Sequence, residues 1–125
     1  MKYLAAYGTL RPGLDINKFH IKGYKLVYPG HMYYPAVIKS DPKNKVVVEV
    51  IDVDEESIEG YDSYEGVIHG LYEREKIKVY NGKDFFADAW IYVAGNTLIK
   101  VKEKFIDVAN QNWLSEEAVE ERLVG

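Results

Sequence analysis

The pattern of apolar and polar positions along the chain predicts strands over much of its length. The predicted strands cover residues 3–7, 24–28, 34–38, 45–53, 72–80 and 85–93. The run of β-branched residues at 46–51 is typical of a central strand. Asn81-Gly82 predicts an antiparallel hairpin between the last two strands. Residues 100–109 fit helical spacing in part and a strand in part, so both interpretations stay open there.

The main helix is predicted to begin after Asp54, a suitable N-cap that two further acids follow in the first turn. Gly66 allows the left-handed turn that ends this helix. One face carries Ile58, Tyr61 and Glu65, which are spaced i, i+3 and i+7. If the first two point into the protein, Glu65 does too. A carboxylate among aromatic rings loses hydration, and its pKa rises toward the range useful to a general base.

The alternative is that Glu65 is simply solvated where the helix frays, and the spacing leaves both interpretations open. Two shorter helical stretches are also predicted. One is capped by Asp15, with Leu14 and Phe19 facing the core, and the other is capped by Ser115.

These elements predict an α+β fold: a small mixed, largely antiparallel β-barrel with one or two packed helices. A chain of 125 residues suits a single domain spanning residues 1–125. The apolar fraction of 47% and the charged fraction of 29% are ordinary for a soluble protein. A net charge of -4 disfavours nucleic acid as a partner. No apolar run suits a signal peptide or a membrane span, so a cytoplasmic location without membrane partners is expected.

The residue types also limit the chemistry. The chain has no cysteine, which excludes disulfides, a thiol nucleophile and cysteine-ligated metals. His20, His31 and His69 are scattered without ligand spacing, so no metal site is predicted. Eleven tyrosines suggest a cavity or surface lined with rings that also carry hydroxyls.

The loop after the first strand is the second candidate for a site. Its residues are Tyr7-Gly8-Thr9-Leu10-Arg11-Pro12-Gly13. Two glycines and a proline force an irregular backbone, which can turn several N–H groups toward an anion such as a carboxylate. It lacks the Gly-Lys-Ser/Thr ending of a Walker phosphate loop. A plain tight turn explains the same residues, and Arg11 is either a ligand for a substrate carboxylate or an ordinary exposed arginine.

Three stretches in this order are similar to the signatures of the γ-glutamylcyclotransferase-like family, which includes γ-glutamylamine cyclotransferase-like proteins. They are Tyr7-Gly8-Thr9-Leu10-Arg11-Pro12-Gly13, Tyr61-Asp62-Ser63-Tyr64-Glu65-Gly66 and Tyr72-Glu73-Arg74. Gly23 and Tyr34-Pro35-Ala36 fit the same pattern, and Asn112-Trp113 echoes a segment near the family's C-terminus. The resemblance runs from about residue 3 to residue 93.

The resemblance implies a barrel-like α+β fold around one cavity. It also implies an enzyme that converts a γ-glutamyl amine or γ-glutamyl amino acid to 5-oxoproline and a free amine or amino acid, without a cofactor. The glutamate matching Glu65 would be the general base, and the loop matching residues 7–10 would hold the substrate. The chain departs from the family pattern at Val48, where many members carry glycine. It departs again at Gly60 and Tyr61, where the helix more often has helix-forming and leucine residues.

Tyr72 and Arg74 lie two apart on one strand and so share a face. Tyr72 is a candidate to donate its hydroxyl to substrate, and Arg74 a candidate to pair with Glu65, Asp62 or another acid. A barrel-lining tyrosine and a structural ion pair explain them equally well.

Two other functions compete with a cyclotransferase. One is a two-carboxylate hydrolase using Asp62 and Glu65, and the other is a non-catalytic small-molecule binding module of the same fold. The leaving group of a γ-glutamyl substrate stays open, with its pocket expected from residues 31–35 and from residues after Gly95. Oligomeric state is open too.

Overall fold

The computed structural model describes residues 2–29 and 34–113, and its centre is a closed barrel. Within these residues the barrel strands are β1 (Lys2–Ala6), β5 (Lys45–Val53), β2 (Phe19–Lys22), β6 (Tyr72–Asn81) and β7 (Asp84–Ala94), in that spatial order. Neighbouring strands pair antiparallel except β1 and β7, whose parallel contact at Leu4 and Trp90 closes the barrel. The predicted mixed, largely antiparallel barrel is therefore confirmed.

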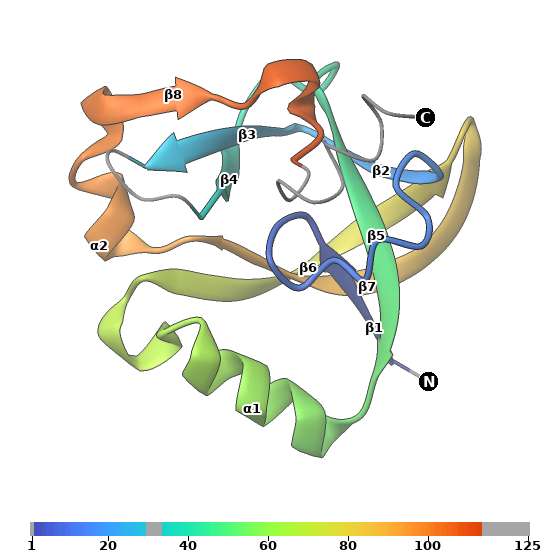
Figure 1. Cartoon of the computed structure of the whole chain (residues 1–125), viewed down its shortest axis with the longest axis horizontal. Coiled ribbons are helices and arrows are strands. Elements are labelled where there is room, and N and C mark those ends of the chain that lie inside the picture. Colours follow the sequence, from blue (N-terminus) through green and yellow to red (C-terminus); the bar gives the residue numbers. More distant parts are fainter. Residues whose placement is uncertain (1, 30–33, 114–125) are drawn as a thin grey trace.

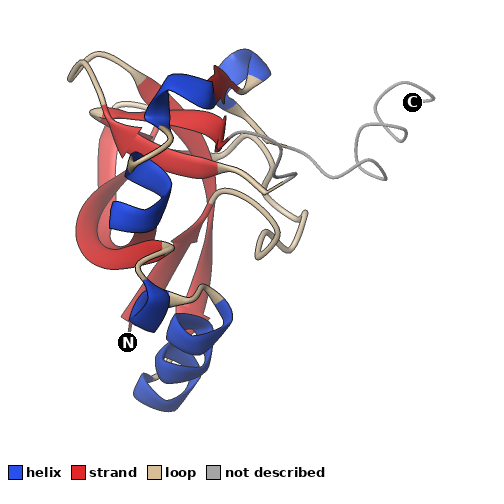
Figure 2. Ribbon diagram, turned by 90° about the vertical axis from the view of Figure 1, so that its left-hand side faces the viewer, coloured by secondary structure: helices blue, strands red, loops and turns tan. Residues whose placement is uncertain are grey.

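A smaller sheet packs beside the barrel. Its strands, in spatial order, are β4 (Ala36–Lys39), β3 (Tyr24–Pro29) and β8 (Phe105–Asp107). The helices are α1 (Glu55–Tyr64) and α2 (Asn96–Ile99), with 3-10 turns at Val67–His69, Lys102–Lys104 and Ala109–Gln111. Figure 1 shows α1 below the barrel strands and the small sheet above them. The quarter turn in Figure 2 keeps α1 at the lower end of the molecule.

The two faces of the barrel strands support two apolar clusters. Alternate residues of a strand point to opposite faces, and β7 shows this directly. Ala89 and Ile91 join a cluster with β5 and β2, whereas Tyr92 packs in a second cluster with Ile58 of α1. The second cluster fixes α1 against the barrel, so the end of that helix has a defined position.

The hairpin prediction is confirmed, because β6 and β7 meet at Asn81 and Gly82 takes a left-handed φ of 62°. The run at 45–53 is a central strand, with β1 on one side and β2 on the other. The predicted helix after Asp15 is wrong. Residues 13–18 form bends and turns, and Leu14 is 83% exposed. Phe19 is buried as expected, but it begins β2, where ladder pairing with Val48 outweighs a weak helical pattern.

The ambiguous stretch from residue 100 resolves into a 3-10 turn followed by β8. Gly95 is the N-cap of the short helix α2. The predicted helix at Ser115 lies outside the described residues. A single domain over residues 1–125 therefore stays a prediction.

Candidate functional site

A cavity of about 320 Å³ opens where β1, the end of α1 and the start of β6 meet. Its walls are Leu4, Ala5, Ala6, Tyr7, Gly8, Thr9, Leu10, Tyr34, Pro35, Tyr64, Glu65, Leu71, Tyr72 and Tyr92. This volume is at the lower end of small-molecule clefts, which span roughly 300–1,000 Å³. The lining is mostly apolar or aromatic, and Glu65 is the one carboxylic acid among its described residues. Such a site suits a small ligand with one reactive polar end.

Glu65 reaches the cavity from the C-cap of α1. Its backbone N–H donates to the Tyr61 carbonyl at 2.8 Å, and Gly66 then turns the chain with a left-handed φ of 66°. Ile58 is buried on the same helix face, and Tyr61 packs against the second apolar cluster, as the spacing predicts. Burial raises the pKa of Glu65 to about 7. Glu65 therefore lies in the cavity rather than free in solvent, and near neutral pH it exchanges a proton easily.

Three buried tyrosines surround this carboxylate. The hydroxyl of Tyr7 donates to the Tyr92 carbonyl at 2.6 Å, and that of Tyr72 donates to the Pro35 carbonyl at 3.0 Å. Burial, with the Glu65 charge as a further cause, raises the pKa of Tyr7, Tyr72 and Tyr92 well above the usual range. All three therefore stay neutral and act only as hydrogen-bonding groups.

The loop after β1 forms one wall of the cavity through Gly8, Thr9 and Leu10. Gly8 packs tightly against Pro35, since an added Cβ would lie 2.9 Å from the proline Cγ. The carbonyl of Pro35 also accepts the hydrogen bond from the Tyr72 hydroxyl. The close contact between the loop and Pro35 leaves no room for a side chain at position 8, which explains the need for glycine there.

Asp62 and Arg74 form a separate network behind the cavity. Arg74 Nε lies 3.1 Å from Asp62 Oδ1, which also accepts the Tyr92 hydroxyl at 2.7 Å. The Arg74 guanidinium stacks 4.4 Å from the ring centre of Trp90. Of the acids that the sequence left open as partners of Arg74, the structure shows Asp62. Asp62 is absent from the described cavity wall, so the two carboxylates of the hydrolase interpretation do not share one site.

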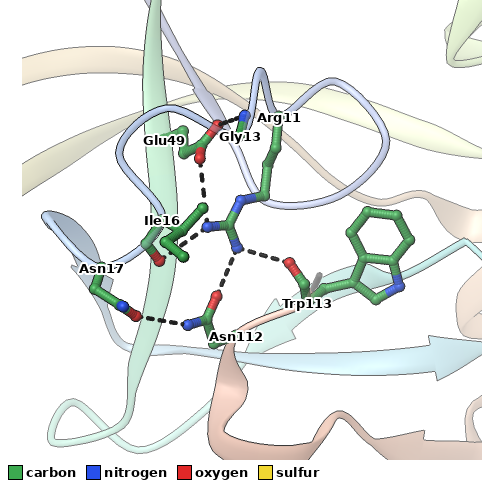
Figure 3. Close-up of polar contacts among 7 residues, drawn as sticks. All are labelled: Arg11, Gly13, Ile16, Asn17, Glu49, Asn112 and Trp113. Carbon is green, nitrogen blue, oxygen red and sulfur yellow. Dashed lines mark hydrogen bonds and ion pairs between the residues drawn. The ribbon is translucent and has the colours of Figure 1, made fainter. Parts of the chain in front are cut away.

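Arg11, a candidate ligand for a substrate carboxylate, is not among the residues that line the described cavity. Its guanidinium lies 3.6 Å from the carboxylate of Glu49, and the two side chains are 4% and 1% exposed. It also donates to Asn112 Oδ1 and the Trp113 carbonyl at 2.7 Å, and to the Ile16 carbonyl at 2.9 Å (Figure 3). Burial against these acceptors is favourable for a guanidinium, which has five donors to satisfy.

Glu49 was not predicted as a site residue, although it stands alone as an acid in an apolar run. Its Oε2 accepts the Gly13 N–H at 2.8 Å, at the end of the loop that Arg11 also belongs to. The pair therefore fastens the loop to β5 and to residues 112–113 (Figure 3). Val48, where the family often has glycine, is fully buried in the core beside this pair.

The cavity also uses residues that sequence patterns did not indicate. Leu4, Leu71 and Tyr92 line it, and each reads in the sequence as an ordinary strand or turn residue. Pro35 and Tyr34 were expected in the leaving-group pocket and do line the cavity, whereas residues 31–33 lie outside the described part.

Within residues 2–29 and 34–113 no group of three His, Asp or Glu side chains gathers as a metal site would need. The expectation of a metal-free, cofactor-free site stays a prediction. In the same described residues, no helix has the length and apolar character needed to span a membrane.

The chain is similar to several known proteins. The family described as "Gamma-glutamyl cyclotransferase, AIG2-like" matches residues 4–115. A protein of Methanocaldococcus jannaschii named "Putative gamma-glutamylcyclotransferase MJ1514" is 31% identical in an alignment over 104 residues that covers 74% of this chain and 83% of that one.

Solved structures share the fold. An AIG2-like protein of Mus musculus superposes with a TM-score of 0.68 at 18% identity. The superposition covers 93% of this chain and 90% of the mouse chain. A gamma-glutamyl cyclotransferase superposes with a TM-score of 0.62 at 16% identity, covering 99% of both chains. The match over residues 4–115, together with the archaeal relative, confirms the resemblance found in the sequence. The chain therefore belongs to the gamma-glutamyl cyclotransferase, AIG2-like family.

Proposed function

We propose that this protein converts a γ-glutamyl amine or γ-glutamyl amino acid to 5-oxoproline and a free amine or amino acid, with Glu65 as general base. The observation that carries the proposal is the position of Glu65. It is the single ionisable acid in the described wall of an otherwise apolar and aromatic cavity, with a pKa raised to about 7 by burial. Family membership supports the same reaction class.

The reaction needs one group that moves a proton in both directions. The substrate's α-ammonium gives a proton to Glu65, and the resulting amine attacks its own γ-carbonyl carbon. A new C–N bond closes the five-membered ring, and the bond to the leaving nitrogen breaks. Glu65 returns the proton to that nitrogen as the bond breaks. It then takes the second proton that the ring nitrogen must lose and passes it to the freed amine, so no water or co-reactant is consumed. A carboxyl group whose pKa lies near the working pH performs both transfers well.

The walls supply the holding groups for this cyclisation. Backbone N–H groups of the loop at Gly8–Leu10 would bind the α-carboxylate end, because a tight loop can turn several donors toward one anion. Tyr7 and Tyr72 donate their hydroxyl hydrogens to backbone carbonyls, so their oxygen lone pairs are available to accept from the substrate's ammonium. Tyr72 would thus contact substrate as an acceptor rather than the donor that the sequence suggested.

The test measures release of 5-oxoproline from a panel of γ-glutamyl amines and amino acids. The wild-type protein should release it from at least one class, and Glu65→Gln should lower kcat by about 10²–10⁴-fold, the usual contribution of a general base. Glu59→Gln is the matched control, since Glu59 is an exposed acid on the same helix, and it should keep full activity. Full turnover in Glu65→Gln would reject the assignment of the base.

The same panel separates the enzyme from a non-catalytic binding module. If wild-type protein binds 5-oxoproline or γ-glutamyl compounds but releases no product from any of them, the binding module is the correct function.

A further inference from the structure

A second, shallower hollow adjoins the cavity along α1. It measures about 400 Å³ and is lined by Leu10, Ser57, Gly60, Tyr61 and Tyr64. Leu10 and Tyr64 line the cavity as well. The two hollows therefore lie next to each other, with this pair of side chains as their shared border. We call this second hollow the α1 groove.

Gly60 forms the open floor of the α1 groove. A glycine inside a helix costs roughly 0.5–1 kcal/mol relative to alanine, so it usually has a conformational or packing reason. Among the glycines that the structure describes, Gly60 alone combines an ordinary φ with no atom within 4 Å of an added Cβ. Neither the backbone nor the packing needs a glycine here. Its consequence in the structure is the free space above the helix.

The lining of the α1 groove is mostly aromatic and apolar. Tyr61 and Tyr64 supply rings and Leu10 supplies an alkyl wall, while Ser57 adds a hydroxyl. No charged side chain belongs to its lining in the described structure. An ammonium or carboxylate in this groove would lose hydration without gaining an ion-pair partner from the lining, whereas an apolar group would gain ring and alkyl contacts.

The position of the α1 groove is suitable for binding the leaving group of the substrate. Glu65 must reach the γ-amide nitrogen to return the proton, so the group on that nitrogen leaves from the Glu65 side of the cavity. Tyr64 precedes Glu65 in the chain and forms the border between the two hollows. We propose that the α1 groove binds the group attached to the γ-amide nitrogen and favours a neutral aromatic or apolar amine. This inference rests on the proposed function.

The test measures binding, so that it does not depend on turnover. Calorimetry with the Glu65→Gln protein compares three γ-glutamyl amides, which carry an ethyl, a phenethyl or a 5-aminopentyl group. The phenethylamide should bind about tenfold more tightly than the ethylamide, as expected for partial burial of one ring. The cationic aminopentylamide should bind no more tightly than the ethylamide.

A variant that fills the groove should remove this difference. Gly60→Phe, made in the same Glu65→Gln protein, should reduce the phenethyl-to-ethyl advantage from about tenfold to about one. Glu59→Phe is the control, because it adds the same ring to an exposed neighbouring position outside the groove lining, and the advantage should persist. If Gly60→Phe does not fold, Tyr64→Ala removes a wall ring instead and should give the same loss.

Equal affinity for the ethyl and phenethyl amides would overturn the proposal, as would preference for the aminopentylamide or an advantage that survives Gly60→Phe. Turnover of the three amides by wild-type protein is scored separately. Ring-dependent binding without any 5-oxoproline would reject the proposed reaction and keep the groove as a binding site. Release of 5-oxoproline at equal efficiency from all three amides, with equal affinities, would keep the reaction and reject the groove.

Discussion

At the residue scale the site depends on one carboxylate in surroundings that disfavour its charged form. Tyr7, Tyr72 and Tyr92 surround Glu65 and exclude the water that would stabilise its charge. Their hydroxyl hydrogens point to backbone carbonyls or to Asp62, so they are not directed at Glu65. The carboxylate therefore gains reactivity, and the folded protein bears the free-energy cost of ionising it.

This cost predicts a pH-dependent stability. Burial raises the pKa of Glu65 from 4.5 to about 7, so between these values the folded state binds more protons than the unfolded state. The free energy of unfolding should then fall as pH rises through this window, and reach its lower plateau above pH 7. Glu65→Gln lacks this titration and should be more stable than wild type at pH 8 by about 1–2 kcal/mol, after allowing for solvent screening of a partly open carboxylate.

Urea unfolding of both proteins at pH 5 and pH 8 measures the difference. A stability gap that stays constant between the two pH values would contradict the burial of a titrating Glu65. The rate of 5-oxoproline release should follow the opposite trend and rise with pH through about 7, since the base acts when it is deprotonated.

At the element scale, α1 is a short helix whose two ends are stabilised by capping and whose centre has low helix propensity. Asp54 Oδ1 accepts the Ser57 N–H at 2.7 Å, and two acids occupy the first turn. Gly66 closes the helix in a left-handed conformation, where an added Cβ would lie 2.7 Å from Leu71 Cδ1. Gly60 in the centre has no such constraint. The ends of the helix thus fix Glu65, while its middle leaves the α1 groove open.

Substitution at the two glycines should have opposite effects. Gly60→Ala should raise the free energy of unfolding by about 0.5–1 kcal/mol, because alanine lowers the entropy of the unfolded chain and its Cβ meets no atom within 4 Å. Gly66→Ala should lower it, since it combines a strained φ of 66° with a close contact to Leu71. Chemical denaturation of the two variants compares them directly. A stabilising Gly66→Ala or a clearly destabilising Gly60→Ala would contradict this description of the helix.

At the scale of the whole molecule, a buried cluster joins three distant parts of the chain. Arg11 and Glu49 bring together the loop after β1, the central strand β5 and residues 112–113 (Figure 3). Asn112 extends the cluster by donating to Asn17 at 2.9 Å. The loop that forms a cavity wall is therefore held in place by residues more than one hundred positions later in the sequence.

Removing one member of this ion pair should strongly destabilise the folded protein. Arg11→Met leaves the Glu49 charge buried without its partner, and the free energy of unfolding should fall by about 3–5 kcal/mol. The double variant Arg11→Met, Glu49→Leu removes both charges and should be less destabilised than the sum of the two single variants. Denaturant unfolding of all four proteins gives the coupling free energy. Additive losses would show that the two charges do not interact.

The sequence by itself determined the elements with strong local signals. The β-branched run at 45–53 gave the central strand, Asn81-Gly82 gave the hairpin, and Asp54 and Gly66 gave the ends of α1. These features depend on backbone preferences and on hydrogen bonds a few residues apart, which neighbouring residues specify. The spacing also placed Glu65 on the same helix face as Ile58, because helical periodicity fixes which positions share a face. It left open whether Glu65 is solvated at the helix end, and the tertiary structure decided that it lines the cavity.

Only the tertiary structure decided which of these residues meet. Arg11 belongs to the loop after β1 but is absent from the described cavity lining, since a buried guanidinium goes where Glu49 and several carbonyl groups can satisfy it. Leu14 is exposed and Phe19 joins a strand, because pairing along β5 supplies more contacts than an isolated helical turn. The cavity and the α1 groove arise where strands, loop and helix converge. Their shape depends on long-range packing, which local spacing does not specify.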